Sequence, residues 1–328
     1  MRSTAKATIG IVLLTAAAAW AGDIDPALVS ADAKWVAHLD VSGMLESGLG
    51  KALLEKLQDE RIQARIAEFS QAFGFDPRTD LDSVSLWGTG YRPDDGVAVF
   101  KGVFDHDRLL ALLDKNEGHE TSQHGEFTVH RWTQRPEGPN DEGERYGTFY
   151  REGVVLVTRA KATLENALDQ LAKAGGTLVG QDAPALLPKR AEGTFFFAAG
   201  SDLSGVAAVH PRAQWTRLVS SAHMVFGQTD GTVFLDIELT AGDEPNATRL
   251  RNVVSGMLAV AQLRIAAAEQ DDKPAPFWAP LVNGAKVGGE GSTVRLGLSI
   301  SQDELVPILQ KARQAKAFRP VASHLRPR

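Results

Sequence analysis

The sequence predicts an α+β protein with two similar modules, each a mainly antiparallel sheet packed with helices. Alternating apolar and polar runs, typical of strands, recur along the chain and are separated by turn residues. Asp95-Gly96 and Asp230-Gly231 each lie between two such runs and favour hairpins, because Gly adopts positive φ at no steric cost. The same order of elements, β-α-β-β-α-β-β-α, can be assigned to both halves, which indicates an internal duplication.

The chain opens with a predicted signal peptide, residues 1–21. Arg2 and Lys6 precede an apolar run over residues 7–19, and Ala19-Trp20-Ala21 then supplies the small residues that a signal peptidase reads. The run is shorter than the roughly 20 apolar residues that a membrane-spanning helix needs. We therefore expect cleavage near Ala21, a periplasmic or secreted mature protein, and no stable membrane insertion afterwards.

Composition excludes several classes of function. The chain contains no Cys, which excludes disulfides, thiolate ligands, a cysteine nucleophile and a lipid anchor on an N-terminal cysteine. Removal of Arg2 and Lys6 from 35 basic residues leaves 33 against 41 acidic ones, a formal charge of −8 for the mature protein. Nucleic acid is therefore not an expected partner, since its recognition depends on a concentrated cationic face.

The first module is predicted to span residues 22–178. Its expected elements, in chain order, are a strand over 33–41, a helix over 50–73, a hairpin over 83–104, a helix over 107–116, a hairpin over 149–157 and a helix over 161–174. Leu164, Leu168 and Leu171 follow the spacing of one helical face. We expect this last helix to pack on its own sheet.

A Gly- and Pro-containing linker over 179–192 is predicted to lead into a second module over 193–318, and a flexible tail over 319–328 follows. The expected elements of the second module are a strand over 194–200, a hairpin over 222–239, a helix over 246–269, a hairpin over 287–298 and a helix over 302–316. The helix over 246–269 has an apolar stretch between Arg251 and Arg264 that is too short to span a membrane. We expect it to be a buried core helix.

Two aromatic residues provide a test of the duplication. Trp87-Gly88 and Phe226-Gly227 each end the strand that enters a hairpin turn. If the modules are equivalent, the two aromatic side chains should superpose and each should be buried against the helices of its own module.

No run of residues has the spacing of a known catalytic or cofactor motif, and no cofactor is expected. His106, His119, His124 and His130 lie in one stretch with several acids, so a small metal site is conceivable there. Their spacing matches no compact zinc motif. We therefore interpret them as solvated loop residues and predict no metal site.

The predicted function is that of an exported, non-catalytic binding or interaction protein for an unknown protein or small ligand, held in a cleft between the two sheets. The alternative is an envelope hydrolase whose site is assembled from residues distant in sequence. For either function the candidate site residues are the polar residues on otherwise apolar strands: His38, Asp40, His223 and Asp236.

Two segments of the first half carry a resemblance. Residues 31–40 (Ala-Asp-Ala-Lys-Trp-Val-Ala-His-Leu-Asp) and 74–84 (Gly-Phe-Asp-Pro-Arg-Thr-Asp-Leu-Asp-Ser-Val) resemble a loosely defined group of secreted bacterial proteins with no assigned activity. The resemblance implies an exported, duplicated α+β protein. It assigns a role to no residue.

Overall fold

The computed structural model describes residues 23–56, 63–64, 66–67, 70, 75–116, 118–134, 136, 142–209, 211–270 and 276–317. The predicted signal peptide over 1–21 and the predicted tail over 319–328 lie outside these residues. Most of the second half of the helix predicted over 50–73 also lies outside the described residues. The first half of that helix is present as α2.

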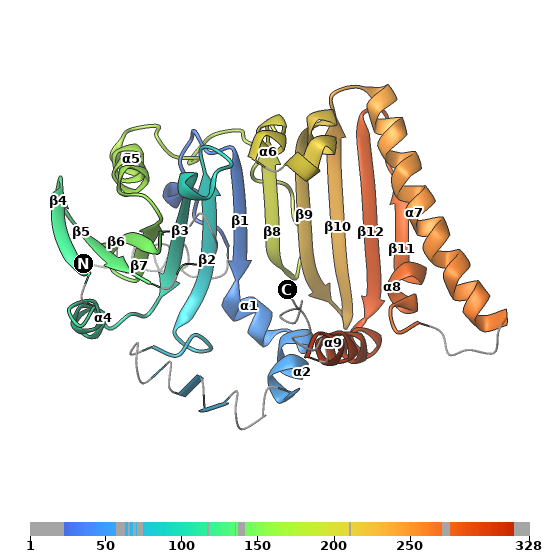
Figure 1. The fold of residues 1–328 in the computed structure, drawn as a ribbon, viewed down its shortest axis with the longest axis horizontal. Helices are drawn as coiled ribbons and strands as arrows, with labels where there is room; N and C mark the ends of the chain where they lie inside the picture. The colour runs from blue at the N-terminus through green and yellow to red at the C-terminus, as the bar shows by residue number, and fades with distance from the viewer. Residues whose placement is uncertain are drawn as a thin grey trace, which may run out of the picture.

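Twelve strands in the described part of the chain form one antiparallel sheet, in the order β11-β12-β10-β9-β8-β1-β2-β3-β7-β6-β5-β4 (Figure 1). The strands are β1 (Trp35–Asp40), β2 (Leu81–Gly88), β3 (Gly96–Gly102), β4 (Glu120–His124), β5 (Phe127–Thr133), β6 (Glu144–Arg151), β7 (Val154–Thr158), β8 (Thr194–Ser201), β9 (Val219–Thr229), β10 (Thr232–Ala241), β11 (Ala285–Gly288) and β12 (Thr293–Ser301). The α-helices are α1 (Val41–Glu46), α2 (Gly48–Lys56), α4 (His106–Leu113), α5 (Lys161–Ala172), α6 (Ser204–Val209), α7 (Glu244–Gln270), α8 (Ala279–Gly284) and α9 (Gln302–Ala317).

The two halves of the chain share this sheet. β1 pairs with β8 in the middle of it, with Ala37 opposite Ala198. The α+β prediction is confirmed, but the expectation of a separate sheet in each module is wrong, because the first strand of each half hydrogen-bonds to the other. The described part of the chain therefore has no cleft between two sheets. The first half also contains an unexpected hairpin, β4–β5, which turns at Gly125 with a φ of +58°.

The test of duplication by the two aromatic residues fails. Across the four central strands, Trp87 of β2 is paired with Val36 of β1. Val36 is paired with Ala199 of β8, and Ala199 with His223 of β9. Directly opposed residues of antiparallel strands point to the same face of a sheet, whereas residues an odd number of positions apart along one strand point to opposite faces. Phe226 is three positions after His223 on β9 and therefore faces away from Trp87. The two aromatic side chains do not occupy matching positions.

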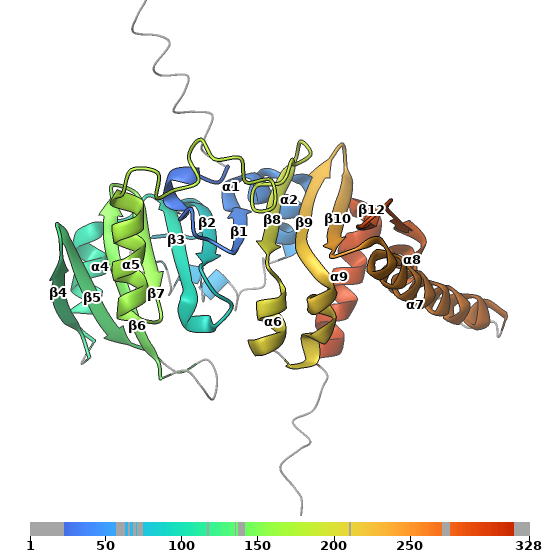
Figure 2. The ribbon, with the colours of Figure 1, turned by 90° about the horizontal axis from the view of Figure 1, so that it is seen from above.

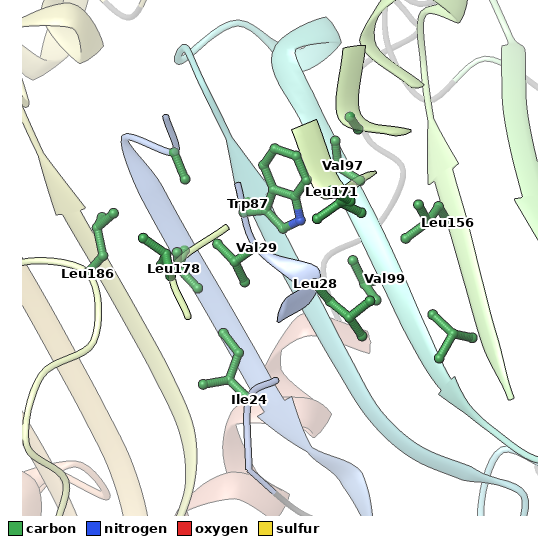
Figure 3. Close-up of a cluster of buried hydrophobic side chains, with 14 of the residues drawn as sticks. Ile24, Leu28, Val29, Trp87, Val97, Val99, Leu156, Leu171, Leu178 and Leu186 are labelled. Carbon is green, nitrogen blue, oxygen red and sulfur yellow. The ribbon is translucent and has the colours of Figure 1, made fainter. Parts of the chain in front are cut away.

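We call the side of the sheet toward which Trp87 points the Trp87 face, and the other side the Phe226 face. The Trp87 face carries the larger core, in which Leu164 and Leu168 of α5 pack on the first half of the sheet and are 0% and 2% exposed. Leu28 and Val29 from the segment before β1 join this core (Figure 3). The predicted leucine stripe of α5 is thus confirmed. It is buried because α5 lies across the sheet with that stripe inward.

The Phe226 face of the second half carries a separate core. Leu305 and Ile308 of α9 pack there with Val233 and Ile300 of the strands and with Leu49 of α2. On the Trp87 face of the same half, Phe197 and Val225 near the middle of the sheet join the larger core. Farther out, Asp236, Glu238 and Arg295 make this face polar, as expected of an antiparallel sheet with one face toward water.

Helix α7 lies at the β11 end of the molecule and extends beyond the sheet in both views (Figures 1 and 2). Ala247 and Ile265 on one side of α7 are buried, but Val253 and Met257 on the other side are 58% and 61% exposed. The expectation of a buried core helix is therefore wrong, because only one of its two apolar sides meets the protein. Among the described helices none is long and apolar enough to cross a membrane.

Candidate functional site

The four residues predicted from the sequence share the Trp87 face but do not form one site. His38 is 3% exposed, and its Nδ1 lies 2.8 Å from the hydroxyl of Ser85 on the neighbouring strand. Its ring packs at 5.7 Å from the ring of Phe197. These contacts make His38 a hydrogen-bonded residue of the core.

Asp40 caps a helix. Its carboxylate accepts a hydrogen bond from the backbone N–H of Gly43, at 2.8 Å, and so satisfies one of the free donors at the start of α1. Burial raises the pKa of this carboxyl above its ordinary value, and the Gly43 N–H only partly offsets that effect. The side chain therefore has a local structural role.

His223 and Asp236 lie on the polar side of the second half. Asp236 is exposed and His223 is partly exposed. Asp236 is in register with His38, with Phe197 and Val225 on the two strands between them. Three steps of about 4.8 Å separate the two by roughly 14 Å, which is too far for one catalytic pair.

A better site lies on the Phe226 face of the first half, between α4 and strands β5, β6 and β7. It is a pocket of about 460 Å³, within the range of small-molecule sites. Its floor is formed by His130, Trp132, Gly147, Phe149, Val155 and Val157, and its roof includes Leu109, Leu112, Leu113 and Asn116.

The pocket exists because α4 stands away from the sheet. The leucines that α4 turns toward the sheet are only partly buried, and the helix contributes no buried side chain. Its two ends are nevertheless held: His106 packs its ring 4.1 Å from that of Phe149, and Asn116 donates a hydrogen bond to the carbonyl oxygen of Thr133 at 2.8 Å. At Gly147 a Cβ would lie 3.0 Å from the Trp132 ring, so glycine is what lets that indole lie across the floor.

Three side chains form a hydrogen-bonded series that ends at this pocket. Asp114 Oδ1 lies 3.1 Å from His119 Nδ1, and His119 Nε2 lies 3.1 Å from His130 Nδ1. With His119 neutral, its Nδ1 donates to Asp114 and its Nε2 accepts from His130. The Nε2 of His130 is then an acceptor, and no described residue donates to it.

Burial keeps the imidazole of His130 neutral near pH 7. His130 is 7% exposed, and burial lowers the pKa of its imidazole below the ordinary value. The neighbouring His119 and His106 lower this pKa further, against a small opposing effect of Asp114. The pocket thus combines largely apolar walls with the neutral imidazole of His130. The polar side chains of Asn116, Thr133, Gln134 and Thr148 also line it.

No family model matches the chain, and no curated protein matches it. Among solved structures, the fold is similar to crystal form III of TP0453 of Treponema pallidum, with 10% identity, 88% of this chain and 99% of that chain covered, and a TM-score of 0.48. Crystal form I of TP0453 has 9% identity, coverage of 89% and 99%, and a TM-score of 0.42. Crystal form IV has 11% identity, coverage of 89% and 98%, and a TM-score of 0.44. The resemblance to secreted bacterial proteins stays a prediction.

Three of the histidines grouped in the sequence lie close together. His119 and His130 are largely buried, contrary to the expectation of solvated loop residues, whereas the side chain of His106 is 55% exposed. His130 lines the pocket, His119 stacks on it, and His106 packs against Phe149 of the floor. His124 lies on the opposite face and bonds to Asp169 of α5 at 2.7 Å. The separation arises because Gly125 turns the chain, so that His124 and His130 lie on different strands. No group of three or more His, Asp and Glu side chains in the described residues is arranged to hold a metal ion.

Proposed function

We propose that this protein is an exported, non-catalytic binding protein that takes a small apolar ligand with one hydrogen-bonding head group into the pocket beneath α4. The observation that carries the proposal is a cavity of about 460 Å³, walled mainly by leucine, valine and aromatic side chains, in which the Nε2 of His130 receives no hydrogen bond from a described residue. Export rests on the predicted signal peptide.

The partly buried leucines of α4 supply the binding energy. A ligand chain placed between α4 and the sheet would remove the remaining exposed surface of Leu109, Leu112 and Leu113 from water. Burial of apolar surface is worth roughly 0.8 kcal/mol for each CH₂ group. A short aliphatic chain therefore gains several kcal/mol before the cost of ordering it.

His130 sets the chemistry of the head group. A neutral imidazole nitrogen that accepts a hydrogen bond favours a ligand hydroxyl, which can donate one. For this role we assign His130 the tautomer in which its Nδ1 donates to His119 and its Nε2 accepts from the ligand. The ligand class is therefore an aliphatic or aromatic alcohol.

The alternative function, an envelope hydrolase, lacks a nucleophile at this site. Asp114, His119 and His130 resemble a base with its orienting groups, but such a base acts on a hydroxyl within hydrogen-bond reach. No Ser or Thr hydroxyl among the described residues bonds to the Nε2 of His130. The four residues predicted from the sequence are too dispersed to replace it.

The test is a fluorescence titration of residues 22–328 with N-phenyl-1-naphthylamine, followed by displacement with 1-dodecanol. Leu112→Trp fills the pocket from its roof and should weaken probe binding at least tenfold. Ala111→Trp adds the same side chain one position earlier, where α4 is exposed, and should bind as the wild type does.

Circular dichroism must show both variants folded, and Leu112→Phe replaces Leu112→Trp if the larger side chain prevents folding. The proposal is wrong if the wild type shows no saturable probe binding, or if the pocket-filling variant and the Ala111→Trp control bind equally well.

A further inference from the structure

Helix α7 exposes a continuous apolar stripe on the side that faces away from the protein. Its large members, Val253, Met257, Val260 and Leu263, are 58%, 61%, 52% and 69% exposed. A helix normally turns such residues inward, and exposed apolar patches of this kind mark interaction surfaces. The opposite side of α7 is already occupied by its packing on β10, β11, β12 and α8.

The spacing of the stripe matches a helical partner. Val253, Gly256, Val260, Leu263 and Ala267 follow one another at steps of three, four, three and four, the pattern of the contact positions of a two-helix coiled coil. All five are exposed. The pattern covers two heptads, which is about 21 Å of helix at 1.5 Å per residue.

A hollow of about 500 Å³ lies beside the stripe. It is lined by Gly256, Met257, Val260, Ala261, Arg264 and Trp278. Gly256 has no atom within 4 Å of the place where a Cβ would stand, so the stripe is open there. A protruding side chain from another helix fits such a hollow, and Leu263 is the most exposed member of the stripe itself.

Charge selects the orientation of two paired α7 helices. Arg249 and Arg264 border the stripe, and α7 has no acidic residue between Glu244 and Glu269. A parallel pair would place each arginine against its own copy. An antiparallel pair with Leu263 opposite Gly256 places Arg264 opposite Ser255 instead and separates the two Arg264 positions by about 13 Å along the axis.

We propose that the occupant of this surface is a second copy of the chain, joined through an antiparallel α7–α7 contact about a two-fold axis near residues 259 and 260. In this arrangement each Leu263 enters the hollow beside Gly256 of the other copy, and Val260 lies opposite Ala259. Large side chains thus meet small ones on both sides of the axis, as a self-complementary contact requires. An anionic lipid surface fits less well, since the mature chain carries a formal charge of −8 and lipid needs no hollow to fill.

The test is sedimentation velocity of residues 22–328 between about 1 and 200 µM in 0.15 M NaCl. We expect a reversible monomer–dimer equilibrium with a dissociation constant on the order of 10 µM, since a two-heptad contact is at the small end of stable interfaces. Leu263→Glu should raise this constant at least thirtyfold. Gln262→Glu adds the same charge on the adjacent, exposed position outside the stripe and should leave the dimer intact.

Orientation is tested by single cysteines, in a chain that has none of its own. Ala259→Cys, near the axis, should form an intermolecular disulfide, whereas Val253→Cys should not, because its two copies lie about 20 Å apart along the axis. A wild type that stays monomeric up to 200 µM overturns the proposal. So does a stripe that binds phosphatidylcholine–phosphatidylglycerol vesicles as a monomer and loses that binding in Leu263→Glu, because lipid is then the occupant.

Discussion

Replacement of Trp87 is the sharpest test of the core as described. The indole is 2% exposed and packs on the Trp87 face among residues of β1, β3 and α5 (Figure 3). Trp87→Ala removes a large buried aromatic side chain and leaves a cavity beneath α5. The expected loss is about 3–5 kcal/mol of unfolding free energy, the usual range for a buried aromatic residue in a close-packed interior.

Trp87→Phe separates the packing of this side chain from its polar group. The indole Nε1 forms no hydrogen bond with another described residue, so the change to Phe breaks none. It keeps most of the apolar area and should cost about 1 kcal/mol, close to the limit for conservative core replacements.

Urea unfolding followed by far-ultraviolet circular dichroism measures both values, provided that the m-value is unchanged. A loss below 1 kcal/mol for Trp87→Ala, or equal losses for the two variants, would refute this description of the core.

Two further predictions concern the histidines. His38→Ala should lower the free energy of unfolding by about 2–3 kcal/mol, because it leaves a cavity and removes the partner of the buried Ser85 hydroxyl. Asp236→Ala, at an exposed position, should change the free energy of unfolding by less than about 0.5 kcal/mol. Thermal unfolding of both variants measures the difference, and equal effects would contradict this prediction. The lowered pKa of His130 means that the unfolded chain binds a proton more readily, so stability is fully present above the unfolded value of about 6.5 and is lost as the pH falls through the folded pKa. Urea midpoints between pH 7.5 and 5 should fall less in His130→Gln than in the wild type, and equal slopes would show that His130 is not the group responsible.

Local patterns in the sequence predicted local structure well. The leucine spacing of residues 164–171 identifies the buried side of α5, and Asp230-Gly231 forms the predicted hairpin turn with φ values of +49° and +76°. At Asp95-Gly96 the hairpin is present, but a short 3-10 helix over Pro93–Asp95 makes the turn, and Gly96 has a φ of −94°. The residues over Pro93–Asp95 therefore form a turn of another type than expected, while β2 and β3 pair as predicted.

The contacts that could not be predicted are those between distant segments. Pairing of β1 with β8 joins strands about 160 residues apart, and nothing in either strand indicates its partner. The error over Trp87 and Phe226 has the same origin. A shift of one position along a strand turns its side chains to the opposite face of the sheet. A β-bulge at Thr194–Phe196 alters the register of β8 against β9 in this way.

Helix α7 and the pocket show a second limit of sequence patterns. Residues 246–269 have apolar residues on two sides of the helix, and periodicity does not tell which side is covered.

The sequence does not predict the pocket, for a different reason. Leu109, Leu112 and Leu113 have the spacing of an ordinary packing face, and only the distance between α4 and the sheet turns that face into the roof of a cavity. An alternation signal at Phe127, Val129 and Arg131 after Gly125 was present, and it could have revealed the β4–β5 hairpin.

The most direct test of the pocket is a methyl NMR titration with 1-dodecanol on protein labelled at its leucine and valine methyl groups. The account predicts saturable shifts at the methyls that line the pocket, namely those of Leu109, Leu112, Leu113, Val155 and Val157. The methyls of Val253, Val260 and Leu263 on the exposed stripe of α7 should not shift together with them. Shifts confined to the α7 stripe, or shifts that rise linearly without saturation, would contradict a binding site beneath α4.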